Sequence, residues 1–73
     1  MKVKTLKNVV SAVKISYSVF DTNGNFIDDF KVDYMGDRKK LDENLGKYLK
    51  YENCEVRNVS TCGEWLEISI TKK

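Results

Sequence analysis

Few side chains in this sequence could do chemistry, and the most versatile one is missing. There are two cysteines, Cys54 and Cys62, and no histidine, so the commonest general base is absent. A zinc site would need carboxylates to complete it. The adjacent Asp28 and Asp29 would point to opposite faces of a strand and could not act as a pair. Cys62 has no identifiable base or oxyanion motif beside it. We therefore expect a non-catalytic protein with no metal and no cofactor.

The spacing of the cysteines predicts two free thiols. If residues 54–60 form a strand, Cys54 and Cys62 lie about 25 Å apart at ~3.3 Å per residue, whereas a disulfide needs Cα atoms within ~7 Å. Free thiols suit a reducing compartment. The apolar stretch after the first lysines is interrupted by Ser11 and Lys14, which argues against a signal peptide. No run approaches the ~20 apolar residues of a membrane helix. We expect a cytoplasmic protein without membrane contact.

One short segment partly matches a calcium loop. Asp21, Asn23 and Asn25 occupy its first three ligand positions. The invariant glycine should be the sixth loop residue and a glutamate the twelfth, but these positions hold Phe26 and Val32. A hairpin turn explains the same residues better.

The first predicted structural element is a hairpin around Asn23-Gly24, which would position the side chains on its two strands. This dipeptide lies between two alternating apolar runs and favours a type I′ turn. The first strand would start near Val9 or Val10 and end near Phe20, and the second would run from 26 to about 34. The register then pairs Val13 with Tyr34, Ile15 with Val32, Tyr17 with Phe30, Val19 with Asp28, and, on the opposite face, Phe20 with Ile27. Asp28 would face an otherwise apolar side, where its pKa could be raised unless water reaches it near the turn.

A helix and a second hairpin follow. Asp37 is a natural N-cap, and Leu41, Leu45, Tyr48 and Leu49 form an apolar stripe that predicts a helix to about Tyr51. Residues 54–60 and 64–71 read as strands. We expect a three-residue loop at 61–63, which places Val59 beside Trp65.

The sequence therefore predicts one α+β domain over residues 1–73, in the order ββαββ. Two hairpins would form a four-stranded antiparallel sheet with one helix across its apolar face. Residues 1–8 would be a short strand or arm, although Leu6, Val9, Val10 and Val13 also have helical spacing. The order of the strands is not readable. The expected core comprises Val13, Ile15, Tyr17, Phe30, Val32, Tyr34, Leu41, Leu45, Tyr48, Leu49, Val56, Leu66, Ile68 and Ile70.

Two surfaces are candidates for binding. On the outer sheet face we expect Phe20 with Ile27 and Val59 with Trp65; aromatic–aliphatic clusters rimmed by charge are typical of protein interfaces. The alternative is that the N-terminal arm covers these side chains through Val3, Leu6, Val9 or Val10. Exposed edge strands would also permit pairing with a second copy.

The other surface is basic. Arg38, Lys39 and Lys40 would occupy the first helical turn, where the helix dipole disfavours cations, and lysines mark both termini, including Lys72 and Lys73. Such residues could bind nucleic acid, but two arginines are few for specific recognition and the net charge is only +2. The expectation is a small accessory or inhibitor-type module that binds a protein partner; the alternative is a nucleic-acid-binding protein of modest affinity.

Overall fold

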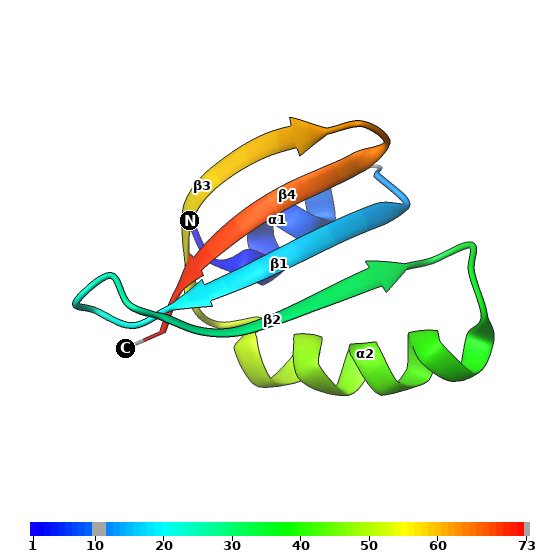
Figure 1. The fold of residues 1–73 in the computed structure, drawn as a ribbon, viewed down its shortest axis with the longest axis horizontal. Coiled ribbons are helices and arrows are strands. Elements are labelled where there is room, and N and C mark those ends of the chain that lie inside the picture. The colour runs from blue at the N-terminus through cyan, green and yellow to red at the C-terminus, as the bar shows by residue number, and fades with distance from the viewer. Residues whose placement is uncertain (10–11, 73) are drawn as a thin grey trace.

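The computed structural model describes residues 1–9 and 12–72, and within these ranges it contains two helices beside one four-stranded sheet (Figure 1). The elements are α1 (Val3–Val9), β1 (Lys14–Phe20), β2 (Phe26–Asp33), α2 (Arg38–Tyr51), β3 (Glu55–Cys62) and β4 (Trp65–Thr71). The predicted ββαββ order is confirmed. The start of the first strand predicted near Val9 is wrong, because β1 begins at Lys14; Val10 lies outside the described residues, as does Lys73.

The sheet is mixed, and the prediction of a purely antiparallel sheet is wrong. Its strand order is β2-β1-β4-β3, and the two central strands, β1 and β4, run parallel. The crossover through α2 carries the chain from one edge of the sheet to the other (Figure 1). Three side chains of β1 and two each of β4 and β2 are buried, whereas β3 has none and is mostly exposed. The more apolar strand of each hairpin, β1 or β4, thus lies at the centre of the sheet, where it pairs with a strand on each side.

The N-terminal segment is a short helix and not a strand or arm. Val3 and Leu6, one turn apart, are 1% and 9% exposed and belong to the core. The amides of Val3 and Lys4 donate to the carbonyl oxygens of Cys54 and Glu52, at 3.0 and 2.9 Å. A helix of seven residues is not stable alone, so α1 forms because this docking satisfies its first amides and buries one face.

The first hairpin has the predicted register but a different turn. Gly24 has φ +86°, and no other residue of the described turn has positive φ, so the predicted type I′ turn is wrong. The amide of Gly24 donates to the carbonyl of Asp21 at 3.1 Å, and the amide of Asp21 donates to the carbonyl of Asn25 at 2.9 Å. The loop therefore has three residues, 22–24, and an extra residue at Ile27 restores the register predicted for Lys14 to Val19. The carboxylate of Asp21 accepts both the Asn23 and Asn25 amides at 2.9 Å.

The second hairpin differs from the predicted one. Its loop is Gly63-Glu64, with Gly63 at φ +62° and Cys62 paired to Trp65. Glycine at the first of two loop positions is the requirement of a type II′ turn. The shorter loop moves every pair of the hairpin, so that Val59 faces Ile68. The predicted three-residue loop at 61–63 is wrong.

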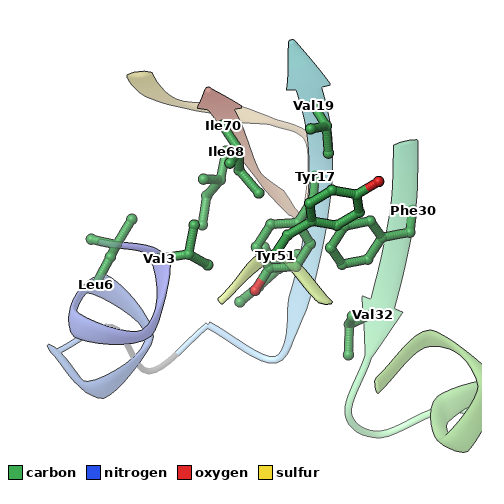
Figure 2. Packing of buried hydrophobic residues seen from close by; sticks show 10 residues of the cluster. Val3, Leu6, Tyr17, Val19, Phe30, Val32, Tyr51, Ile68 and Ile70 are labelled. Atoms are coloured by element: carbon green, nitrogen blue, oxygen red, sulfur yellow. The ribbon is translucent and has the colours of Figure 1, made fainter. Parts of the chain in front are cut away.

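The core lies on one face of the sheet, beneath both helices. Figure 2 shows the rings of Tyr17, Phe30 and Tyr51 gathered between the strands, with Val3 and Leu6 approaching from α1. The buried residues are Val3, Leu6, Ile15, Tyr17, Val19, Phe30, Val32, Tyr51, Ile68 and Ile70. Two predicted core residues are wrong: Val13 is 47% exposed and Leu49 is 63% exposed. The predicted Asp37 cap is confirmed, since its carboxylate accepts the amide of Lys39 at 2.8 Å.

Candidate functional site

The outer face of the sheet is the side opposite the core, and no described helix covers it. Residues of both helices belong to the buried cluster on the other face, and in Figure 1 α1 lies behind the sheet. The alternative in which the N-terminal segment covers the outer face is wrong for Val3 and Leu6, which are buried in the core. Neither Val3 nor Leu6 therefore covers the outer face.

One end of this face is built around Trp65. Lys31 and Lys14 place their ammonium groups 5.3 and 5.7 Å from the centre of the indole ring. Lys14 also pairs with Glu64 across 3.1 Å. Indole is the aromatic ring that attracts cations most strongly. Trp65 is half-buried at the start of β4, with lysines from β1 and β2 beside its ring.

The other end of the face is built around Phe20. The ring of Phe26 meets it edge to face, with centroids 5.9 Å apart, and the guanidinium carbon of Arg57 lies 4.9 Å from its centre. Sequence reasoning missed both partners. Phe26 is the second residue after the loop, and the three-residue loop places it opposite Phe20, where Ile27 was predicted. Arg57 is the extra residue of a bulge in β3, a feature that can re-aim a side chain and that leaves no clear signal in the sequence.

The other two predicted interface residues lie elsewhere. Ile27 is the unpaired residue of the β2 bulge and is 45% exposed. Val59 faces Ile68, which is buried in the core, so Val59 lies on the opposite side of the sheet from Trp65. The structure thus does not pair Val59 with Trp65. The cause is the two-residue loop at 63–64, which shifts the partner of Val59 by three residues, and a shift by an odd number of residues moves side chains to the other face.

Between the two aromatic clusters the outer face is polar and carries charges of both signs. Small hydroxyl side chains, Ser16, Ser18 and Ser69, occupy the middle of β1 and β4. The surrounding charged residues are Lys14, Lys31 and Arg57, together with Asp29, Asp33 and Glu67. The clusters are separated by the length of β1, about 20 Å at ~3.3 Å per residue. The face offers two anchors and a mixed polar surface rather than one basic patch.

The basic cluster predicted for the helix start is a separate surface. Arg38, Lys39 and Lys40 are all exposed on the first turn of α2, which runs alongside β2 and away from β1 and β4 (Figure 1). No acidic side chain lies in that turn. The structure therefore does not bring the two predicted binding surfaces together.

Two residues of α2 donate hydrogen bonds to Asp28. Its carboxylate accepts the Tyr51 hydroxyl at 2.8 Å and the Lys47 ammonium at 3.1 Å. These hydrogen bonds, the one from Tyr51 first, hold the pKa of Asp28 below its ordinary value. A raised pKa, which the sequence pattern allowed, is not what the structure shows. Burial and the bond to Asp28 raise the pKa of Tyr51 to about 12, so its hydroxyl remains a donor at neutral pH.

This arrangement predicts acid-dependent stability. The pKa of Asp28 is lower in the folded chain than its ordinary value of 3.8. The contribution of the ionised carboxylate to the free energy of unfolding is therefore complete above pH 3.8, and it is lost as the pH falls through the lower pKa of the folded chain. We expect Asp28→Asn to be less stable than the natural chain at pH 7 and the difference to shrink below about pH 4. Urea unfolding of both chains at several pH values measures this. A difference that is constant down to about pH 2.5 would contradict it.

The remaining features of the described residues carry no recognisable chemistry. An open hollow of about 300 Å³ is lined by Lys2, Asn53, Cys54, Glu55 and Thr71, and none of the predicted site residues lines it. Within residues 1–9 and 12–72, no three histidine, cysteine or acidic side chains gather as a metal site would require. No helix in these ranges is long and apolar enough to cross a membrane. Both cysteines are free thiols.

The fold and the outer face define a small α+β domain with a mixed four-stranded sheet and one uncovered side. Comparison with known proteins adds no relative: no family model matches the chain, and no curated protein or solved structure is significantly similar to it.

Proposed function

We propose that this chain is a small non-catalytic module that binds a protein partner through the outer sheet face. The observation that carries the proposal is the pair of aromatic–cation clusters on a face that no described helix covers. Tryptophan and arginine are enriched among the residues that dominate protein interfaces. Here Trp65 and Arg57 are held in place by neighbours from other strands, so little side-chain freedom is lost on binding.

The charge pattern favours a protein over a polyanion at this face. Nucleic-acid sites present a basic stripe that neutralises phosphates, whereas Asp29, Asp33 and Glu67 interrupt the basic residues of the outer face. Mixed charges around apolar anchors are typical of a polar interface rim. The partner should therefore present a surface of mixed charge with recesses for aromatic rings.

The test compares substitutions on the outer sheet face with a substitution on α2. Phe26 is 58% exposed on the outer face, and Leu49 is 63% exposed on α2, so either can be changed to serine with little cost to folding. Partners captured by the immobilised natural chain are first identified, and their affinities for the variants are then measured by calorimetry. We expect Phe26→Ser and Trp65→Ser to weaken binding, each by about 30-fold or more if it is an anchor, and Leu49→Ser to leave it unchanged. The reverse pattern would contradict the proposal.

A nucleic-acid-binding function is the second candidate, favoured by one observation. Arg38, Lys39 and Lys40 are exposed together in a helical turn that contains no acid. Anisotropy titrations of labelled mixed-sequence DNA and RNA at low and moderate salt test this function. Salt-sensitive binding that disappears when the three residues are changed to serine, and persists in Trp65→Ser, would support it over the outer-face proposal.

A further inference from the structure

The two edges of the sheet are protected to different extents. In β2, the backbone groups that point away from β1 belong to Asp29, Lys31 and Asp33, because the alternate residues bond to β1. All three carry charges, and the Lys47 ammonium donates to the carbonyl oxygen of Asp29 at 3.3 Å. Charged side chains and a capped carbonyl are means by which natural sheets prevent edge pairing.

The β3 edge is covered only at its beginning. The Val56 amide donates to the Met1 carbonyl at 2.7 Å, and Lys2 forms a bridge with Glu55. From Arg57 to Cys62 every residue is exposed. Its protection is confined to Arg57, which is charged and forms the bulge; from Asn58 to Cys62 there is no charged residue and no proline, so this part lacks the usual protection of an edge strand.

The hairpin geometry identifies the backbone groups that this edge presents. In a two-residue hairpin the closing pair, here Cys62 with Trp65, is hydrogen-bonded, and bonded and non-bonded pairs then alternate. The backbone groups of Ser60 and Asn58 therefore point to β4, and those of Val59 and Thr61 point outward. No hydrogen bond to another described element uses the outward groups. Val59 and Thr61 are also β-branched, which favours a strand.

We infer that this edge pairs with the same edge of a second copy, antiparallel and about a twofold axis at Ser60. In this register Val59 of each copy lies opposite Thr61 of the other, and all the outward groups of both residues are bonded. If the twofold axis lay at Val59 or at Thr61 instead, only one of these two residues would lie in a hydrogen-bonded pair with the same residue of the second copy, and the outward groups of the other would not be paired in this way. In this pairing Arg57 of each copy lies near Glu64 of the other copy. The twofold axis therefore creates two pairs of opposite charge.

The pairing would join the two sheets into one continuous sheet. Residues directly opposite in an antiparallel pair share a face, so Ser60 meets Ser60 and Asn58 meets Cys62 on the outer side. The two outer faces would then lie side by side as one larger surface. The segment involved is much shorter than the 20–30 residues a side of a standard interface. The dimer should therefore be weak, and its population should rise with concentration.

Engineered cysteines test the register. In a Cys54→Ala, Cys62→Ser background, Ser60→Cys should form a disulfide-linked dimer on mild oxidation, because the two cysteines face each other within the ~7 Å limit. Asn58→Cys in the same background is the matched control: the two copies of residue 58 lie about 13 Å apart, four residues along the strand at ~3.3 Å each, and should not link. Asn58→Cys with Cys62 retained should link again, through residue 62 of the other copy.

Sedimentation of the natural chain from micromolar to millimolar concentration tests the dimer itself without oxidation. We expect a concentration-dependent shift to dimer that Val59→Lys abolishes and Ile27→Lys, on the other edge, preserves. A monomer at every concentration, or equal cross-linking of residues 58 and 60, would overturn the inference. That failure would leave the proposed partner-binding face standing, because the face depends on Phe26 and Trp65 and not on this edge.

Discussion

Leu6→Ala is expected to lower the free energy of unfolding by about 2–5 kcal/mol. The side chain is 9% exposed and belongs to the buried cluster. It lies on α1, a seven-residue helix that has no stability of its own and depends on docking. A chain of 73 residues is stable by only about 4–11 kcal/mol in total, so this one change could unfold a large fraction of the molecules.

Urea unfolding followed by circular dichroism measures this loss. Leu49→Ala is the matched control, because it deletes the same atoms from a side chain that is 63% exposed, and it should change stability by no more than about 0.5 kcal/mol. Equal effects of the two substitutions would mean that α1 is not packed against the sheet, and the core described here would then be wrong.

Tyr51→Phe is expected to lower the free energy of unfolding by about 1.5–3 kcal/mol, the usual contribution of a hydrogen bond to a charged group. The Tyr51 hydroxyl donates to Asp28 at 2.8 Å from a residue that is 3% exposed. Without this donor the carboxylate keeps only Lys47 among its side-chain partners. The bond also joins the end of α2 to β2, so its loss should loosen the helix.

Tyr17→Phe provides the comparison for this prediction. Tyr17 and Tyr51 both stack on Phe30, with ring centroids 4.5 and 5.9 Å away. The buried Tyr17 hydroxyl, however, makes no hydrogen bond of standard geometry among the described residues, and the polar groups beside it are the neutral hydroxyls of Tyr34 and Tyr48. Removing an unsatisfied polar group is neutral or favourable, so Tyr17→Phe should be as stable as the natural chain or slightly more so. If thermal and urea unfolding show the two variants to be equally destabilised, the stated role of the Asp28 bond is wrong.

The first hairpin shows how local sequence can predict a register through the wrong turn. The alternation of apolar residues in β1 and β2 excluded any pairing shifted by one residue, because only the unshifted parity keeps Ile15, Tyr17, Phe30 and Val32 on one face. The loop closed differently, with an extra residue at Ile27 to compensate. The apolar pattern extends over the whole strand and outweighs the preference of one Asn-Gly pair.

The candidate site was predictable only in part. Phe20 and Trp65 were predicted on the outer face because each is close to a turn in an alternating strand, and the structure places both there. Arg57 and Phe26 were missed, and Val59 was placed on the wrong face, because a bulge or a change of one residue in loop length reverses the side of every residue beyond it. Local propensities do not specify such changes.

The sequence by itself determined the four strands and the capped helix α2, because these depend on periodicity and on neighbouring residues. It did not determine how the elements combine. The parallel pairing of β1 with β4, the docking of α1 and the bond from Tyr51 to Asp28 all join residues that are distant in the chain. These contacts form because together they bury the most apolar strand of each hairpin and satisfy amides and a carboxylate that would otherwise lack partners. This burial and these hydrogen bonds form only when the whole chain is folded.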